Sequence, residues 1–142
     1  MSESDVVMLL GLVEHGFNTG DLDALDDVLA PDVVVHSPLP VPPGAEGLKA
    51  TFAEIRKGFP DAHATIDDLV YEGDRIYRRW TVRGTHNGEF AGIPPTGRRI
   101  EISGVDVERF HEGRIVEHWN FFDRLLLMEQ LGVAPAPETT SR

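Results

Sequence analysis

The first sixty residues carry the apolar spacing of helices. Large apolar side chains recur there at steps of three and four residues, which places them on one helical face. They are Val6, Leu9, Leu10, Val13 and Phe17. Ser4 stands at the expected N-cap, and the run Asn18-Thr19-Gly20 predicts the end of this helix. The pattern predicts a second helix from Asp21, its N-cap, to Pro31, and a third over residues 46–57.

After residue 60 the period changes to the alternation of strands. Two strand-like runs, over residues 64–71 and 75–85, flank one turn, and two more, over 99–110 and 114–122, flank another. Each turn places a glycine among polar residues, which is typical of a hairpin. The stretch between the hairpins, residues 86–97, is rich in Gly and Pro and is predicted to be a loop.

The order of these elements predicts an α+β fold. A short β-branched run at residues 33–35 lies between the helices, and a last helical turn is expected over 125–131. Three N-terminal helices would cover one face of a strongly curved, cone-shaped sheet, with a pocket between its concave face and the helices. Residues 1–133 form a single domain in this interpretation, and residues 134–142, which lack a large apolar side chain, form a disordered tail.

The charge balance narrows the classes of partner. The 142 residues include 24 acidic and 13 basic side chains, so the formal net charge is −11 and neither nucleic acid nor an anionic membrane surface is a favourable partner. No apolar run approaches the roughly 18 residues of a membrane span. The acidic N-terminus lacks the basic region of a secretory signal, so we expect a cytoplasmic protein. The absence of cysteine excludes disulfides, thiolate nucleophiles and cysteine-bound metals.

The last predicted strand carries the most informative side chains, because alternate residues of a strand share a face. One face holds two carboxylates in line with two aromatic rings: Ile115, Glu117, Trp119, Phe121 and Asp123. The other holds Val116, His118, Asn120 and Phe122. We expect the first face to line the pocket, where burial beside the rings would suit Asp123 to shuttle protons near neutral pH. The spacing equally allows Asp123 to cap the helix that follows.

Two histidines and one arginine are further candidates for the pocket. His36 ends the β-branched run and lies either at the pocket mouth or on the surface. His86 opens the Gly/Pro-rich loop and either closes over a ligand or occupies an ordinary turn. Four arginines on one predicted strand most simply balance neighbouring acids, although one, such as Arg79, could bind a carbonyl oxygen. No histidine pair has metal-ligand spacing and no glycine-rich phosphate loop is present, so we expect neither a metal nor a cofactor.

Two stretches of the chain resemble a known family. The first runs from Gly84 to Gly97 and reads GTHNGEFAGIPPTG. The second comprises Arg109-Phe110, Gly113-Arg114-Ile115, Glu117, Trp119, Asp123 and the closing Gln130-Leu131-Gly132. Both are similar to motifs of the SnoaL-like polyketide cyclases, also called ester cyclases, and the helical N-terminus followed by a strand and His36 fits as well. The resemblance covers nearly the whole chain before the tail.

This resemblance implies a nuclear-transport-factor-2-like cone that is usually dimeric and works without a metal or cofactor. The best-studied members close a ring of an aromatic polyketide methyl ester by intramolecular aldol condensation, a step of antibiotic biosynthesis. Their general acid/base is an acidic residue at the end of the last strand, which corresponds to Asp123 here. In the mechanism that we expect, His36 or His86 polarises the carbonyl or stabilises the enolate oxygen. The side chains expected to bind a small apolar or aromatic carbonyl substrate are His86, Phe90, Trp119, Phe121 and Arg79.

Two other functions fit the same cone. An epoxide-opening enzyme needs an acid for the epoxide oxygen and a base for water, which Asp123 with Glu117 or an arginine could supply. A binding domain without catalysis would use the cavity alone, and its Asp123 would face solvent or cap a helix. We also expect a homodimer through the convex face of the sheet, where the alternation places His118, Asn120 and Phe122.

Overall fold

The computed structural model describes residues 2–133, and the predicted tail at 134–142 lies outside them. The helices are α1 (Glu3–Thr19), the 3-10 helix η1 (Leu22–Asp27), α2 (Gly44–Gly58) and α3 (Arg124–Gln130). The strands are β1 (Leu29–His36), β2 (His63–Glu72), β3 (Arg75–Thr85), β4 (Arg99–His111) and β5 (Arg114–Phe122). These bounds confirm both predicted hairpins, the loop between them and the first and third helices to within a few residues.

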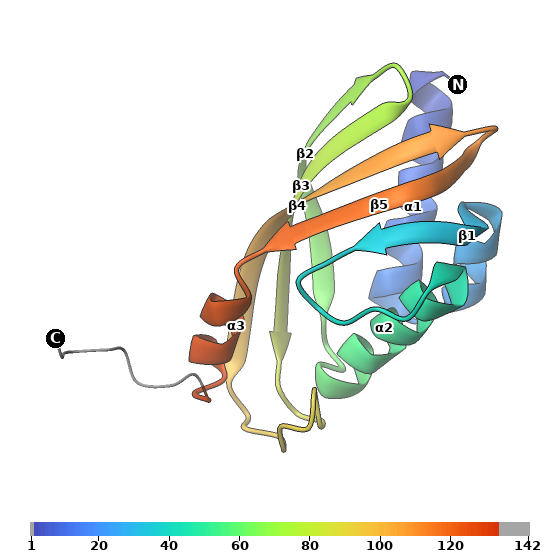
Figure 1. Ribbon diagram of the computed structural model, residues 1–142. Coiled ribbons are helices and arrows are strands. Elements are labelled where there is room, and N and C mark those ends of the chain that lie inside the picture. The colour runs from blue at the N-terminus through green and yellow to red at the C-terminus, as the bar shows by residue number, and fades with distance from the viewer. Residues whose placement is uncertain (1, 134–142) are drawn as a thin grey trace, which may run out of the picture.

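The strands of the described chain form one mixed sheet in the order β1-β5-β4-β3-β2. The meander from β2 to β5 is antiparallel, and β1 pairs in parallel with β5. Figure 1 shows that the long strands bend along their length, with α1 and α2 packed against one side of them. The predicted α+β fold with a curved sheet is therefore confirmed.

The second predicted helix is wrong in type and in length. η1 is a short 3-10 segment that ends at Asp27, and Pro31 belongs to β1. Because β1 is an edge strand, the missing N–H of proline leaves no ladder bond unmade. Leu29 is buried under the sheet edge, and this tertiary burial overrides the helical spacing of the sequence. The N-cap of α1 is Ser2 rather than Ser4.

The core lies between the inner face of the sheet and the helices. One cluster of buried side chains joins α1, η1 and β1 to the sheet and includes Val6 and Leu25. A second cluster lies around the loop after β3 and the C-terminal helix and includes Phe59 and Leu127. Among residues 2–133, no helix has the length and apolar character that a membrane crossing requires.

A β-bulge in β5 decides which of its side chains face the core. Successive residues of β4 pair with Ile115 and Glu117, so Val116 is an extra residue in the ladder. An extra residue reverses the alternation of faces beyond it. Ile115 and His118 are consequently both buried on the inner face, at 1% and 5% exposure.

Candidate active site

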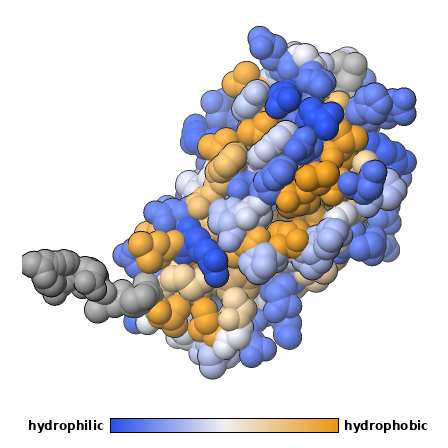
Figure 2. Space-filling view, viewed as in Figure 1, coloured by the Kyte–Doolittle hydropathy of each residue, from blue (hydrophilic) through white to orange (hydrophobic). Residues whose placement is uncertain are grey.

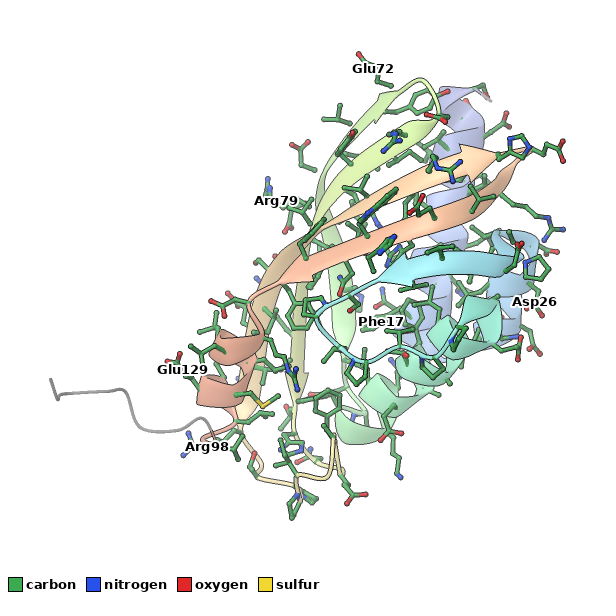
Figure 3. All side chains as sticks on the ribbon, in the orientation of Figure 1. Phe17, Asp26, Glu72, Arg79, Arg98 and Glu129 are labelled. Carbon is green, nitrogen blue, oxygen red and sulfur yellow. The ribbon has the colours of Figure 1, made fainter. Side chains whose placement is uncertain are left out.

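A pocket lies between the inner face of the sheet and the helices. The aromatic rings that line it are Phe17, Phe52, Phe59, Trp80, Phe90 and Phe122. Figure 3 shows Phe17 in the space between the helices and the sheet. The strongest polar groups come from three neighbouring strands, with Arg78 on β3, Asp106 on β4, and His118 and Asn120 on β5. An apolar cavity with a few convergent polar groups is the usual form of a small-molecule site.

Four ionisable side chains form a buried network on this side of the pocket, and we call this network the polar wall. Its members are Arg78, Asp106, Glu108 and His118. Arg78 Nη2 donates to Asp106 Oδ2 at 3.0 Å and to Glu108 Oε1 at 2.7 Å. The second oxygen of Glu108, Oε2, lies 2.6 Å from Nδ1 of His118. Strand register brings them together, because Arg78 pairs with Asp106 and Glu108 pairs with His118. All four are at most 7% exposed, so these charges are compensated by one another instead of by water.

Asp106 is held by three donors. Trp80 Nε1 and Asn120 Nδ2 donate to its Oδ1 at 2.9 and 2.7 Å, and Arg78 donates to its Oδ2. These contacts fix the carboxylate at the pocket wall, with Oδ2 3.9 Å from Nε2 of His118. The wall therefore presents a fixed carboxylate next to an imidazole.

The surroundings of His118 act on its pKa in opposite directions. Burial lowers the pKa, because a charged imidazolium loses its hydration. The adjacent Glu108 carboxylate, supported by Asp106, outweighs burial and raises the pKa of His118 above its ordinary value of 6.5, against a small opposing effect of Arg78. Burial likewise opposes the charge of Arg78, but the two carboxylates raise its pKa further. The environment thus favours a protonated His118 next to Asp106.

Three of these side chains are of the types that bind metal ions in proteins. Asp106, Glu108 and His118 each place one ligand atom within 4.8 Å of the others. Arg78 already donates to an oxygen of both carboxylates. A divalent cation would have to share that space with a guanidinium, which Coulomb repulsion in a buried site opposes. These residues therefore suit an ion-pair network better than a metal site.

The structure contradicts the predicted pocket position of Asp123. Its carboxylate accepts a hydrogen bond from the backbone N–H of Leu126 at 2.9 Å and caps α3, the alternative that the spacing allows. The physical reason is the extra residue Val116, which turns the opposite face of β5 inward. The side chains of β5 that line the pocket are His118, Asn120 and Phe122.

Trp119 and Phe121 lie on the outer face of the sheet instead. Phe121 is 55% exposed. Trp119 stacks on His36 with ring centroids 5.3 Å apart, and His36 Nε2 lies 2.7 Å from Glu117. Arg79 also projects away from the pocket, as Figure 3 shows. The structure therefore contradicts the prediction that these four candidates, His36, Arg79, Trp119 and Phe121, contact a ligand in the pocket.

Of the two loop candidates, Phe90 lines the pocket and His86 does not. His86 is fully buried, and its Nδ1 accepts a hydrogen bond from the backbone N–H of Thr96 at 3.2 Å. Since His86 also packs against Phe59, with ring centroids 5.3 Å apart, it orders the loop that carries Phe90.

Sequence reasoning misses the polar wall because it treats the wall's members as surface charges. Arg78 counts there as one of four arginines balanced by neighbouring acids, and His118 is assigned to the convex face. The signal that identifies the wall lies in β4. Asp106 and Glu108 share a face with the buried Phe110, so two acids stand where the alternation calls for apolar side chains.

Known proteins are similar to this chain in sequence and in fold. The family model of the SnoaL-like polyketide cyclase matches residues 7–131. Aklanonic acid methyl ester cyclase DauD of Streptomyces sp. strain C5 is 28% identical over 143 residues, which cover 95% of this chain and 87% of DauD. Nogalonic acid methyl ester cyclase of Streptomyces nogalater is 29% identical over 122 residues, or 82% of this chain and 89% of that protein.

Solved structures agree with these sequence matches. TsrD from Streptomyces laurentii superposes with a TM-score of 0.85 at 34% identity and covers 94% of this chain and 98% of its own. IdmH from Streptomyces antibioticus superposes with a TM-score of 0.76 at 39% identity, over 89% of this chain and 98% of its own.

Proposed function

The chain belongs to the SnoaL-like polyketide cyclase family, and we propose that it closes a ring in a polyketide-type carbonyl substrate by intramolecular aldol condensation. The family match confirms the resemblance and the cyclase class that the sequence predicts. The observation that carries the aldol proposal is the proximity of Asp106 and His118 at the polar wall of an aromatic-lined pocket.

In this proposal the Asp106 carboxylate is the general base and the His118 imidazolium is the general acid. Asp106 removes a proton from a carbon activated by neighbouring carbonyl groups, and the enolate carbon attacks a second carbonyl of the same molecule. His118 Nε2 donates a proton to the oxygen of that carbonyl, so the new carbon–carbon bond leaves a hydroxyl group. The proton on Asp106 then returns to His118 across the 3.9 Å between Oδ2 and Nε2. The product is an isomer of the substrate, so atoms and electrons balance without a co-reactant.

The aromatic walls supply the rest of the rate acceleration. Ring closure requires two ends of one molecule to be held together, and such positioning replaces a large part of the activation entropy. Phe17, Phe52 and Trp80 can stack against a flat substrate and exclude water from the polar wall. They take the role that the sequence assigns to Trp119 and Phe121.

Conversion of aklanonic acid methyl ester by the purified protein tests the proposal, because relatives of this chain are named for that substrate. We expect a product of unchanged mass with one more ring, formed equally well in EDTA. Asp106→Asn should lower turnover about 10²–10⁴-fold, the usual contribution of general acid/base catalysis. Glu117→Gln, on the outer face, should react at the wild-type rate.

Three results would contradict this proposal. One is a wild-type protein that closes no ring in this ester or in a panel of simpler β-keto esters. Another is a folded Asp106→Asn variant with wild-type turnover. Activity that EDTA removes and a divalent ion restores would contradict the metal-independent mechanism.

Epoxide opening is the second candidate, because the same pair supplies both groups that it needs. His118 would protonate the epoxide oxygen while Asp106 activates a water or hydroxyl nucleophile. Product assays with epoxides alongside the β-keto esters separate the two reactions. A domain that only binds ligands, which the sequence associates with Asp123 as a helix cap, has less support because Asp106 and His118 provide a different acid/base pair in the pocket.

We further propose the homodimer that the sequence predicts, with a corrected surface. His118, Asn120 and Phe122 line the pocket and cannot form the interface. The outer face of the sheet exposes apolar side chains instead: Val34, Val70, Tyr77, Val105 and Phe121. Figure 2 shows apolar groups gathered among charged ones on the face turned to the viewer. Sedimentation at micromolar concentration should give a dimer that Phe121→Glu weakens, and a wild-type monomer would contradict the proposal.

A further inference from the structure

Glu108 does not line the pocket, yet it is the most deeply buried member of the polar wall. Both of its oxygens are occupied, Oε1 by Arg78 Nη2 at 2.7 Å and Oε2 by His118 Nδ1 at 2.6 Å. A carboxylate without access to water is costly unless it is paired and hydrogen-bonded. Its contacts therefore bind the imidazole and the guanidinium into one rigid unit.

The contact at Nδ1 decides which end of the imidazole is left for a substrate. An imidazole has two nitrogens, and a hydrogen bond at one of them sets the role of the other. With Nδ1 bonded to Glu108, the nitrogen that remains is Nε2, which lies 3.9 Å from Asp106 Oδ2. Both His118 and Asp106 line the pocket, so a substrate there meets Nε2.

The charged groups that face His118 also determine its charge. β4 contributes Asp106 and Glu108, β3 contributes Arg78, and the residue paired with His118 on β1 is the apolar Val35. On the helix side, α1 contributes the acidic Glu14 to the lining of the same pocket. With both carboxylates and the guanidinium ionised, the unit carries one net negative charge while the imidazole is neutral. Protonation of His118 brings the net charge of this buried unit to zero, which a low-dielectric interior favours.

We propose that Glu108 is a positioning residue for His118: it holds Nδ1, so that Nε2 faces the pocket, and it keeps the imidazole protonated as the donor in ring closure. The role as donor rests on the proposed function. The tautomer and the charge of His118 can be measured without any turnover, so the two ideas are separable.

Nitrogen-15 NMR of the imidazole rings provides the test, with His118 identified by the signals that His118→Gln removes. In the wild-type protein above its titration midpoint, His118 should carry its proton on Nδ1. In Glu108→Gln the midpoint of His118 should fall by about one to three pH units, the effect of an opposite charge within about 4–6 Å. The matched control Glu117→Gln removes the partner of His36 on the outer face and should leave the midpoint of His118 unchanged.

A pH profile of kcat gives the second readout. A proton donor loses activity as the pH rises through its pKa, so the alkaline fall of kcat should begin at lower pH in Glu108→Gln, by the same displacement as the NMR midpoint. Glu108→Asp, which keeps the charge, should recover part of that displacement.

Either of two results overturns the inference: a wild-type His118 with its proton on Nε2, or an unchanged His118 midpoint in Glu108→Gln. The first needs no Glu108 variant, only the His118→Gln assignment, and holds even if Glu108→Gln does not fold. An Nδ1–H tautomer and a lowered midpoint without any ring closure would support the inference and contradict the proposed function alone.

Discussion

Two histidine–glutamate pairs lie on opposite faces of the same sheet, and only one of them belongs to the pocket. The outer pair joins His36 to Glu117 at 2.7 Å, with side chains that are 47% and 22% exposed. The inner pair joins His118 to Glu108 at 2.6 Å, with side chains that are 7% and 0% exposed. The distances are nearly the same, so any difference in behaviour comes from the surroundings.

The shifted pKa belongs to the glutamate in the outer pair and to the histidine in the inner pair. On the outer face, the hydrogen bond from His36, with Arg109 beside it, holds the pKa of Glu117 below its ordinary value. On the inner face, the carboxylates of Glu108 and Asp106 outweigh burial and raise the pKa of His118. The same two side chains thus make a hydrogen-bonded pair open to water in one place and, in the proposal above, a buried proton donor with its positioning carboxylate in the other.

Replacement of each histidine gives the largest expected contrast. His118→Gln should lower turnover about 10²–10⁴-fold, because it removes the general acid. His36→Gln should leave turnover unchanged, because its ring stacks on Trp119 outside the pocket. Initial rates of ring closure at saturating substrate measure both. Equal rates for the two variants would remove the distinction between the pairs.

Removal of each carboxylate should affect stability just as unequally. Glu108→Ala leaves Nδ1 of His118 without its partner and removes one of the two contacts of Arg78 Nη2 in the interior. Loss of one member of a buried ion network costs about 3–5 kcal/mol. Glu117→Ala should shift the urea midpoint only slightly, because an ion pair that is open to water contributes little. Equilibrium unfolding in urea followed by circular dichroism measures the stability of both variants. A similar loss of stability in the two would mean that burial does not distinguish the inner pair from the outer pair.

The two pairs should also respond to opposite ends of the pH scale. A raised pKa means that the stabilisation from His118 is complete below 6.5 and is lost as the pH rises through its folded-state pKa. A lowered pKa means that the stabilisation from Glu117 is complete above 4.5 and is lost as the pH falls through its folded-state pKa. The free-energy difference between wild type and His118→Gln should therefore shrink in alkali, and that between wild type and Glu117→Gln should shrink in acid. Urea unfolding at a series of pH values measures both, and a parallel response would contradict the assignment.

The fold could be predicted from the sequence because its signals are local. The alternation within residues 64–85 and 99–122 and the glycines at both turns lie within a few residues of each other, and they define both hairpins. The exception is β1, whose assignment to the sheet at Leu29 depends on a parallel pairing with Ile115 far along the chain. No local pattern contains that contact.

The site could be predicted only in part, because one extra residue in β5, Val116, exchanges the inner and outer faces that simple alternation predicts. Phe90 lines the pocket as predicted, and the strand predicted to supply the pocket's polar side chains, β5, does contribute His118 and Asn120 to it. The faces of that strand were exchanged by the bulge at Val116, which no glycine or proline marks in the sequence. An acid at an inward position of β4, such as Asp106 or Glu108, identifies the polar side of the pocket better than the alternation in β5 alone.

The smallest expected effect belongs to Asp123, an acid at the end of β5 whose role is local. Its carboxylate accepts the backbone N–H of Leu126 at 2.9 Å, so Asp123→Ala should destabilise the protein by about 0.5–2 kcal/mol, the usual cost of losing an N-cap. Asn caps a helix about as well as Asp, so Asp123→Asn should keep wild-type stability, and both variants should keep wild-type turnover per folded molecule. Urea midpoints and initial rates on the two variants separate capping from catalysis. A stable Asp123→Asn variant that lost turnover would return the proton shuttle to this position and would leave the inner pair with a structural role only.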